Sequence, residues 1–304
     1  MSVRELVVLG TASQVPTRTR NHNGYLLRFD GQGVLFDPGE GTQRQLLLAG
    51  VAPSQITAIC ITHAHGDHCL GLPGVLQRLS LDGVQRPVPL IYPAEAEQYI
   101  ERLRWASAYD DRLDVRPYPV TGDGPVLQLG EPSLEAAALD HRVPAFGYRL
   151  VEPDGRRMLP ARLAEAGLAG PDVARLVREG TVEAARGTVR VEDVSEIRRG
   201  QRFAFVMDTA LCDGARTLAA DVDLLVCEAT FASADAALAA KYKHLTARQA
   251  AEIAAGANAR RLVLAHFSQR YGDLAPLLAE ARQVFDDVVL AEDLVRIPLP
   301  ARRP

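Results

Sequence analysis

The chain contains 304 residues, 47% of them hydrophobic, and carries a formal net charge of −4. This length suits one large domain or two modest ones. No apolar run approaches the roughly 20 residues that a membrane-spanning helix needs. The first residues lead straight into a strand-like run, so we expect no secretion signal and no membrane partner. The mild negative charge weighs against a nucleic-acid partner but does not exclude one, because a local basic patch can bind phosphate whatever the total.

Short apolar runs predict strands along the whole chain, and helical patterns fill the gaps between them. A hairpin turn is expected at Gly31-Gln32-Gly33. A capping box from Thr246 to Gln249 opens an alanine-rich helix that stops near Gly256. In chain order, the predicted strands cover residues 6–9, 24–30, 34–36, 57–62, 134–139, 203–207, 224–227 and 262–265, and the predicted helices cover 42–48, 94–107, 246–256 and 273–284. This rhythm predicts a layered α/β fold.

Most of the predicted strands end at an acidic or histidine residue. Sites in layered α/β folds gather where strand ends open onto loops. A single polar residue at the end of a strand would carry little information. Several acidic and histidine residues at strand ends predict that these residues lie together along one edge of the fold. The residues at these ends are Asp37, His63, Asp140, His141, Asp208, Glu228 and His266.

The segment from Ile61 to His68 reads ITHAHGDH and is the most informative part of the chain. Three imidazoles and one carboxylate fall within six residues, and both groups suit zinc and its first-row neighbours. A loop can turn them toward one ion, and Gly66 permits a tight turn. A merely solvated loop is the alternative. It is disfavoured because three of the seven histidines of the chain lie here.

The candidate metal ligands number seven, which is too many for one tetrahedral ion and suits two ions that share a carboxylate. Asp208 is the natural bridge, although by itself it would be read as a helix cap. Such a centre activates water for hydrolysis of an acyl or a phosphoryl compound, and metal chemistry does not choose between the two. Cys69 follows the cluster, but a packed thiol is favoured over a ligand. The seven candidates are His63, His65, Asp67, His68, His141, Asp208 and His266.

Residues 152–200 break the rhythm of strands and helices. Pro, Gly and Arg punctuate this stretch, and it contains no histidine. We interpret it as an inserted substrate-binding arm, with residues 1–151 and 201–304 forming the catalytic domain. An ordinary long connection with its own helix is the alternative. The four cysteines, Cys60, Cys69, Cys212 and Cys227, show no paired spacing, so we expect reduced thiols in a cytoplasmic protein.

The order of the candidate ligands resembles the metallo-β-lactamase superfamily, through the His63-X-His65-X-Asp67-His68 motif and then His141, Asp208 and His266. The resemblance covers almost the whole chain. It implies an αββα sandwich, with the site at the edges of the sheets. That superfamily contains esterases, lactonases, thiolesterases, oxygen reductases and nucleases, so the fold alone does not decide the substrate.

Finer motifs are similar to those of the ribonuclease Z family, which trims the 3′ trailer from precursor tRNA. These motifs are Leu9-Gly10-Thr11 through Arg20-Asn21, Asp37 to Gln43, His141 to Arg149, Glu228 to Phe231, His244, and His266 to Tyr271. The resemblance implies a zinc-dependent endoribonuclease that leaves a 3′-hydroxyl. It also implies two Zn²⁺ per chain (Mn²⁺ or another divalent ion being possible), a homodimer, and an arm that grips tRNA.

The resemblance also implies roles for individual residues. Asp67 would orient or deprotonate the attacking water, and Glu228 with His244 would relay a proton to the leaving 3′ oxygen. Taken alone, Glu228 would be read as a surface acid and His244 as a helix-start histidine. The contacts to phosphate or sugar are assigned to Thr17, Arg20, Asn21 and Arg270.

The chain departs from the family pattern in three places. Met207 stands where a glycine usually precedes the bridging aspartate, and Leu245 stands where a serine usually follows the histidine. The arm holds nine Arg against nine Asp or Glu, so its electrostatic grip on RNA is limited. A few arginines would then carry the binding, and the candidates are Arg156, Arg157, Arg175 and Arg178.

Two other functions remain open at this stage. One is a small-molecule phosphodiesterase or arylsulfatase-like hydrolase on the same fold, which the arm and the His266–Tyr271 motif disfavour. The other is an RNA-binding relative without catalysis, which the complete ligand set disfavours.

Overall fold

The structure is a computed structural model that describes residues 3–184 and 187–302. The chain forms two compact units. The larger unit runs up to Val151 and resumes over Arg202–Pro300, and the smaller one contains Glu152–Gln201 with the C-terminal residues from Ala301. No helix in the described ranges is long and apolar enough to cross a membrane.

The first sheet of the larger unit is mixed and has seven strands in the order β18-β1-β2-β3-β4-β5-β6. Pairing from β18 through β3 is antiparallel, and pairing from β3 through β6 is parallel. The strands are β1 Arg4–Gly10, β2 Gly24–Phe29, β3 Gln32–Phe36, β4 Ala58–Cys60, β5 Val88–Pro93, β6 Val115–Val120 and β18 Arg296–Pro298. The helices of this half are α1 Thr42–Leu48, α2 Gly66–Cys69, α3 Leu72–Leu81 and α4 Glu97–Arg104.

The second sheet also has seven strands, in the order β17-β16-β15-β14-β9-β8-β7. Its strands β14 to β17 run parallel, and β7, β8 and β9 complete it as antiparallel neighbours. The strands are β7 Gly124–Gln128, β8 Ser133–Leu139, β9 Ala145–Val151, β14 Arg202–Val206, β15 Leu224–Glu228, β16 Leu262–Ala265 and β17 Val288–Leu290. The helices of this half are α7 Asp213–Ala219, α8 Ala236–Tyr242, α9 Ala247–Gly256 and α10 Ala275–Arg282.

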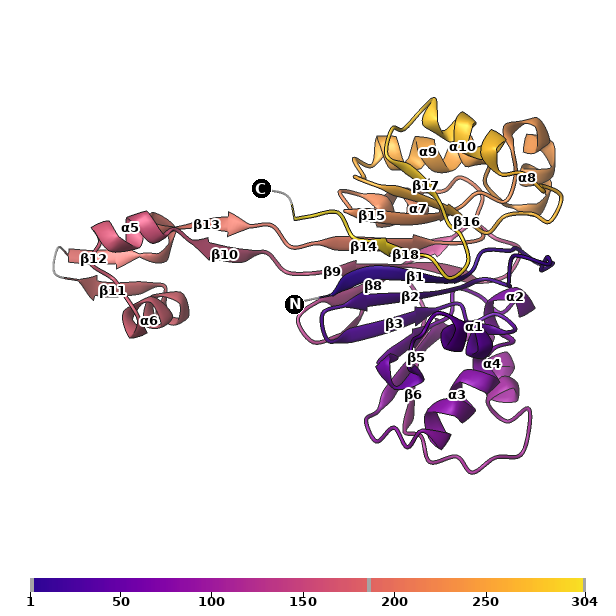
Figure 1. Ribbon diagram of the computed structural model, residues 1–304, viewed down its shortest axis with the longest axis horizontal. Helices are drawn as coiled ribbons and strands as arrows, with labels where there is room; N and C mark the ends of the chain where they lie inside the picture. Colours follow the sequence, from indigo (N-terminus) through magenta and orange to yellow (C-terminus); the bar gives the residue numbers. More distant parts are fainter. Residues whose placement is uncertain (1–2, 185–186, 303–304) are drawn as a thin grey trace. The chain divides into compact units, whose positions relative to one another are not determined.

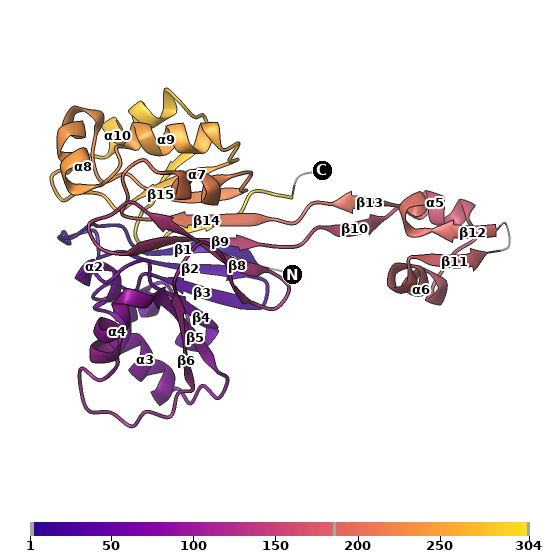
Figure 2. The same ribbon diagram turned by 180° about the vertical axis from the view of Figure 1, so that it is seen from behind.

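The two sheets lie face to face, and the helices cover their outer faces (Figures 1 and 2). Alternation along β1 shows why both faces are buried: Leu6 and Val8 join the core that includes the second sheet, whereas Val7 packs with the helices of the first half. Aromatic rings fill the space between the sheets, and the centroids of Phe36 and Phe205 lie 4.7 Å apart. Each such ring stabilises the sandwich by roughly 1.5–3 kcal/mol through burial. The predicted αββα fold is confirmed.

Several predicted elements agree closely with the structure, and others do not. Helix α1 has the predicted bounds, and the capping box of Thr246 and Gln249 opens α9. The predicted hairpin is present between β2 and β3, but its turn begins one residue and ends two residues earlier than predicted, because β3 already begins at Gln32. The turn lies instead at Asp30, with a φ of 55°, and Gly31. Gly33 is a strand residue, and a Cβ there would lie 2.1 Å from the carbonyl oxygen of Gln55.

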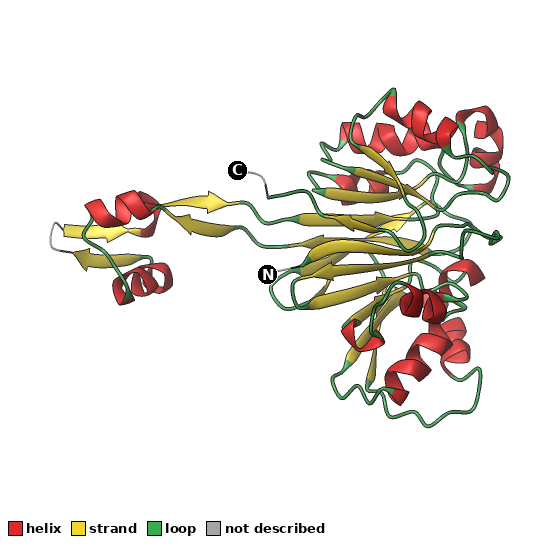
Figure 3. Cartoon of the chain, in the orientation of Figure 1, coloured by secondary structure: helices red, strands yellow, loops and turns green. Residues whose placement is uncertain are grey.

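In its described residues, the smaller unit has two short hairpins, two α-helices and a 3-10 helix at Val191–Val194 (Figure 3). One hairpin pairs β10 with β13, and the other pairs β11 with β12. Five buried apolar side chains form its core, and they are Leu168, Leu176, Val182, Val191 and Val194. The elements are β10 Gly155–Met158, α5 Pro160–Glu165, α6 Pro171–Glu179, β11 Thr181–Ala184, β12 Gly187–Arg190 and β13 Ser195–Arg198.

Candidate metal centre and catalytic pocket

Strand ends from both sheets bring the candidate ligands together. His63 and His65 lie on the loop that follows β4, and Asp67 and His68 lie on α2 directly after it. The other ligands come from the second sheet, where His141 follows β8, Asp208 follows β14 and His266 follows β16. All seven candidates lie in neighbouring clusters: one contains His63, His65, His141 and Asp208, and the other contains Asp67, His68 and His266. Asp208 and His266 also lie together with His244.

The backbone is unusual at four non-glycine residues of this region. Asp37, Asp208, Lys243 and His266 have φ angles of 46°, 26°, 56° and 59°. Non-glycine residues rarely adopt positive φ, and such conformations persist where the surroundings fix them. At each of these four residues the positive φ turns the chain sharply. The turn orients the side chain of that residue or, for Lys243, of the following His244.

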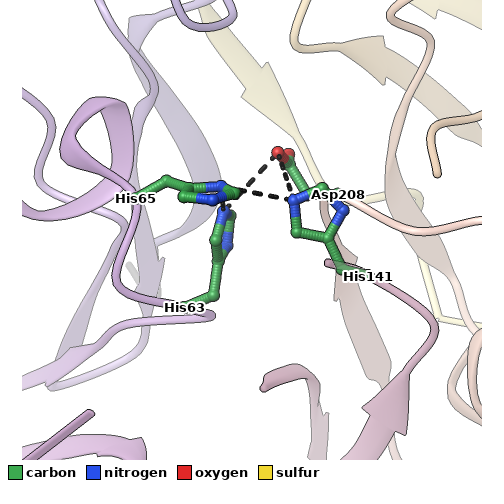
Figure 4. A group of neighbouring side chains, drawn as sticks. All are labelled: His63, His65, His141 and Asp208. Carbon is green, nitrogen blue, oxygen red and sulfur yellow. Dashed lines mark hydrogen bonds and ion pairs between the residues drawn. The ribbon is translucent and has the colours of Figure 1, made fainter. Parts of the chain in front are cut away.

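The first cluster contains His63, His65, His141 and one oxygen of Asp208 (Figure 4). The Nδ1 atom of His65 lies 2.9 Å from Nε2 of His63 and 3.2 Å from Nε2 of His141. Asp208 Oδ2 lies 3.6 Å from the His63 Nε2 atom and 3.7 Å from the His141 Nε2 atom. Three ring nitrogens and a carboxylate oxygen therefore converge on one point, as in a tetrahedral zinc site with nitrogen-rich ligands.

The second cluster contains Asp67, His68 and His266, together with the other oxygen of Asp208. Oδ1 of Asp208 lies 3.1 Å from Nε2 of His266 and 3.4 Å from Nε2 of His68. Oδ2 of Asp67 lies 3.4 Å from the His266 nitrogen and 3.3 Å from the His68 nitrogen. Asp208 thus offers one carboxylate oxygen to each cluster, which is the arrangement of a bridging ligand.

Two buried polar atoms in the second cluster indicate whether a metal ion could bind there. His68 Nε2 and Asp208 Oδ1 are buried, and neither has a hydrogen-bond partner among the described residues. A buried polar atom without a hydrogen-bond partner destabilises the folded protein unless an ion or a water molecule binds to it. Because both atoms point into the same cluster, the donor set fits a divalent cation there.

Outer hydrogen bonds fix the orientation of the histidine rings. Nδ1 of His68 contacts Asp37 Oδ2 at 2.8 Å, and Nδ1 of His266 contacts Thr230 Oγ1 at 2.8 Å. The corresponding atom of His63 lies 3.0 Å from Thr62 Oγ1, and that of His141 lies 3.1 Å from the Lys243 carbonyl oxygen. Each contact leaves Nε2 directed at the centre, as in metal sites where a second partner holds the ring.

Sequence reasoning missed these outer partners. The sequence marks Asp37 only as a strand end and as part of a motif. In the structure it also accepts hydrogen bonds from the backbone nitrogen and the hydroxyl of Thr62, both at 2.7 Å. The signal that could have identified Asp37 is its place at the end of β3. That strand lies beside β4, and the loop after β4 carries His63 and His65.

The electrostatics of the rings suit metal binding. Burial lowers the pKa of His63, His65 and His141, in the case of His65 to about 4, so these rings are neutral and can donate a lone pair. Burial also acts to lower the pKa of His68, but the surrounding carboxylates outweigh it and hold that pKa well above its usual range. The second cluster therefore attracts positive charge, which a divalent ion supplies.

Glu228 and His244 form a buried pair beside the two clusters. The Nδ1 atom of His244 lies 3.0 and 3.1 Å from the two carboxylate oxygens of Glu228. Burial opposes the charge on His244, but Glu228 outweighs it and raises the pKa of His244 to about 9. Glu228 is itself held by the backbone nitrogen of Thr209 at 2.6 Å and by the hydroxyl of Thr230. The imidazole is thus kept protonated with Nε2 4.0 Å from Asp208.

A pocket of about 300 Å³ opens over the clusters and includes Asp67, Asp208 and His266 in its lining. Cation–aromatic pairs supply part of the remaining wall. The guanidinium of Arg142 lies 5.5 Å from the Tyr242 ring centre, and that of Arg270 lies 5.3 Å from the Phe231 ring centre. Guanidinium groups bind phosphates and aromatic rings stack on bases, so this lining suits a nucleotide chain.

The residues expected to touch phosphate or sugar have different surroundings. Arg270 lines the pocket and pairs with Asp235 at 3.3 Å. Arg20 instead donates to the carbonyl oxygens of Ser268 and Tyr271, at 3.3 and 3.0 Å. Thr17 accepts a hydrogen bond from the Arg20 backbone nitrogen at 2.9 Å. The Nδ2 atom of Asn21 donates to the Glu40 carbonyl oxygen at 2.9 Å.

Two neighbours of the ligands have clear packing roles. Cys69 is buried, and its thiol donates to the carbonyl oxygen of His65 at 3.1 Å. Met207 is fully buried in the core between the layers, where a glycine would leave a void. The side chain belongs to the hydrophobic core, and Asp208 makes the turn with its own positive φ of 26°.

An αββα sandwich with two adjacent His/Asp clusters at its sheet edges defines the metallo-β-lactamase superfamily. A family model described by that superfamily name matches residues 17–145, and a model described as a beta-lactamase superfamily domain matches residues 188–267. The predicted superfamily is confirmed.

Known relatives specify the family further. The chain is 60% identical to ribonuclease Z of Nocardia farcinica and 56% identical to ribonuclease Z of Streptomyces coelicolor, over the full length of both chains in each case. The crystal structure of the short form of human tRNase Z matches with a TM-score of 0.71 and 28% identity, covering 98% of this chain and 100% of that one. The chain belongs to the ribonuclease Z family.

Proposed function

We propose that this protein is a zinc-dependent endoribonuclease that removes the 3′ trailer of precursor tRNA and leaves a 3′-hydroxyl. The observation that carries this proposal is the shared carboxylate of Asp208, with one oxygen in each of two His/Asp clusters on the floor of a pocket. Full-length identity of 60% to a ribonuclease Z supports the substrate.

Two Zn²⁺ ions per chain fit the donor set best, because five imidazoles and two carboxylates favour zinc over a hard cation such as Mg²⁺. His63, His65 and His141 would hold one ion, and Asp67, His68 and His266 would hold the other, with Asp208 between them. Bound there, such ions supply Lewis acidity to the phosphodiester and lower the pKa of water. Mn²⁺ is the main alternative.

The protein's own groups then move the protons. Asp67 lies at the pocket floor, where it can take the proton of the attacking water. The water oxygen bonds to phosphorus, and the bond from phosphorus to the 3′ oxygen breaks. His244, held protonated by Glu228, donates its proton to that departing 3′ oxygen. The phosphate stays on the trailer, and the tRNA keeps a 3′-hydroxyl.

We also propose that the smaller unit binds the folded tRNA body, as an arm does. Its charge is balanced, so unpaired arginines matter most. The arginines favoured by sequence are partly neutralised: Arg157 pairs with Glu196, and Arg175 with Asp172. Arg162 and Arg198 are exposed and make no ion pair within the described part of the chain, although Arg162 donates to the Asp193 carbonyl oxygen at 3.2 Å. These two arginines are therefore better candidates for phosphate contacts.

A homodimer is part of the same proposal. Leu47 and Leu81, at the ends of α1 and α3, are 77% and 80% exposed, and Leu70 is 53% exposed. A groove beside Leu47 is lined by α1, by the segment that follows it, including Val51 and Pro53, and by Arg78 of α3. A second copy of the chain would cover these apolar side chains. The four free cysteines fit the reducing cytoplasm, where we expect the protein to work.

One experiment tests the proposed reaction. Zinc-loaded protein is incubated with a trailer-bearing precursor tRNA and, separately, with bis-p-nitrophenyl phosphate. We expect one cut that leaves a 3′-hydroxyl. Hydrolysis of the small diester alone would instead indicate a small-molecule phosphodiesterase, and RNA binding without any hydrolysis would indicate a relative without catalysis.

A matched pair of variants tests the pocket wall. Arg142→Ala should raise the KM for precursor tRNA by about tenfold, in line with the loss of one stacking contact. Arg102→Ala removes a similar pair, with the guanidinium 5.9 Å from the Tyr99 ring centre, on a helix of the first half. The control should leave the KM unchanged. Equal effects would remove the argument for the Arg142–Tyr242 wall.

A further inference from the structure

Asp293 is an acidic residue of the larger unit that no step described above uses. It lies between β17 and β18, and flanking residues fix its segment to β1. The backbone nitrogen of Leu294 donates to the Val8 carbonyl oxygen at 2.8 Å, and Val8 donates to the Val295 carbonyl oxygen at 3.0 Å. The carboxylate is therefore presented from a rigid support.

Donors from Thr11, Asn21 and Gln45 converge on this carboxylate. Thr11 Oγ1 donates to Oδ1 at 2.7 Å, and the backbone nitrogen of Asn21 donates to Oδ2 at 2.7 Å. The side-chain amide of Gln45 adds a longer contact to Oδ2 at 3.3 Å. Thr11 and Asn21 are the two ends of one loop, so Asp293 ties both ends to the same point.

The tied loop forms part of the catalytic pocket. Ser13, Gln14 and Val15 belong to it and line the pocket. Most of its side chains from Gln14 to Arg20 are exposed or only half-buried. Little apolar packing therefore holds this loop, and its position depends mainly on polar contacts at its ends.

The same loop is joined to the neighbouring segment of the pocket wall. Ser13 donates from its backbone nitrogen to the Phe267 carbonyl oxygen at 3.1 Å. At the far end, the Arg20 guanidinium holds the carbonyl oxygens of Ser268 and Tyr271. Residues 268–270 also line the pocket. A shift of the Thr11–Asn21 loop would thus move both parts of the wall, and because Phe267 directly follows His266, the metal content reports whether the shift also reaches a ligand.

We infer that Asp293 is a positioning residue, which fixes the Thr11–Asn21 loop as a preformed wall for the RNA strand on either side of the cleaved phosphate. The inference rests on the proposed function and concerns the substrate-binding half of the pocket. The inference predicts different effects on RNA binding and on hydrolysis. If the loop is loosened, each RNA substrate must order it again on binding, which weakens RNA affinity. A small diester contacts only the metal centre, so its hydrolysis should be unaffected.

Replacement of Asp293 can test this without destroying the fold. Burial raises the pKa of Asp293, even though the Asn21 and Thr11 hydrogen bonds oppose that effect. A buried carboxylate is thus partly unfavourable at neutral pH, and Asp293→Asn should fold as well as the wild type. The amide oxygen can still accept from Asn21, and the Thr11 hydroxyl can rotate to accept from the amide. Asp293→Ala keeps neither contact.

The experiment compares Asp293→Ala and Asp293→Asn on precursor tRNA and on bis-p-nitrophenyl phosphate, with metal content measured for each. We expect Asp293→Ala to raise the KM for precursor tRNA about tenfold, as the loss of charge-assisted hydrogen bonds implies. Its hydrolysis of the small diester should stay within twofold of wild type. Asp293→Asn should restore most of the RNA affinity.

A matched control separates positioning from stability. Asp223 is also buried and accepts from the Arg202 backbone nitrogen at 2.9 Å and from Arg260 at 2.8 Å, but it precedes β15, away from the ligand-bearing strand ends. Asp223→Ala should lower the melting temperature without splitting the two activities. If Asp293→Ala does not fold, Thr11→Val removes one of the contacts and should give a smaller rise in the same KM.

Two results would overturn the inference. One is an Asp293→Ala protein that cleaves precursor tRNA with wild-type KM, and the other is an equal loss of both activities. A wild-type protein that hydrolyses only the small diester would contradict the proposed function instead, so the two failures are distinguishable.

Discussion

The two units of the chain hold their charged groups in opposite ways. In the larger unit, carboxylates and imidazoles are buried at strand ends, and outer partners such as Asp37 fix their rings. In the smaller unit, the charged side chains are mostly exposed and pair with one another across short hairpins, as Arg157 does with Glu196. The buried carboxylates and imidazoles of the larger unit are held in fixed positions. The exposed ion pairs of the smaller unit can open and form with other partners at little cost in free energy.

This difference indicates where single substitutions should have large effects and which property they should change. A buried charge that loses its partner costs several kcal/mol or loses its ligand, whereas an exposed ion pair contributes about 0–1 kcal/mol. We therefore expect substitutions of the buried ligands and their direct partners in the larger unit to act on chemistry, through metal content and proton transfer. Those in the smaller unit should act on affinity and its dependence on salt.

The largest effect is expected at Asp208. Asp208→Ala removes the carboxylate that both clusters share, so both ions should be lost and turnover should be abolished. Elemental analysis should fall from about two zinc ions per chain to near zero, because Asp208 offers one carboxylate oxygen to each cluster. A variant that still holds two ions would show that the clusters do not share this ligand.

Glu228→Gln should have the next largest effect. The amide keeps the size of the side chain but removes the charge that keeps His244 protonated, so turnover of precursor tRNA should fall roughly 10²- to 10⁴-fold. Metal content should stay at the wild-type value, because Glu228 is outside both clusters. Wild-type turnover, or loss of an ion, would refute the proton-relay role.

Asp37→Asn should have an intermediate effect. It weakens the contact that holds the His68 ring, and changes to such outer partners cost about 10- to 100-fold in metal affinity or activity. Competition with a chelator measures that affinity for the variant and the wild type. Asp223→Asn, a buried acid remote from the ligands, is the control and should leave affinity unchanged.

The smallest effect is expected in the smaller unit. Substituting Arg162 and Arg198 together by Ala should weaken precursor tRNA binding several-fold and lower the slope of log affinity against log salt by about one to two. Hydrolysis of bis-p-nitrophenyl phosphate should not change. The matched double variant Arg157→Ala with Arg175→Ala removes arginines that are already paired and should do less.

The reverse ranking would overturn this assignment of arginines. If the paired arginines carry the salt dependence, their ion pairs must open on binding. If neither double variant changes RNA affinity, the smaller unit does not grip tRNA through these side chains.

Much of the fold and of the candidate centre was predictable because local sequence encodes it. An apolar run that ends at His or Asp is visible in sequence, and parallel strands place such ends on one edge, which is why His63, Asp208 and His266 were found together. Strand β6 was missed because Pro117 and Pro119 weaken its signal, and an edge strand tolerates them.

The outer contacts were not predictable, for a physical reason. The pairs of His68 with Asp37 and of His266 with Thr230 join residues 31 and 36 positions apart. Thr230 and Asp37 belong to residue types that are common at strand ends and in loops, so nothing local marks their partners. Only the packing of the strands decides which of them face each other.

The buried thiol of Cys69 has a consequence for oxidative chemistry. Burial raises the pKa of this thiol to about 12, and it raises the pKa of Cys60 and Cys227 well above the usual range. Oxidants and alkylating reagents attack the thiolate, which is almost absent at neutral pH under these conditions. A cysteine next to a zinc ligand would ordinarily make a metalloenzyme sensitive to peroxide. In this protein the sulfur beside His68 is shielded, so oxidative stress should reach the half-buried Cys212 before it reaches the catalytic floor.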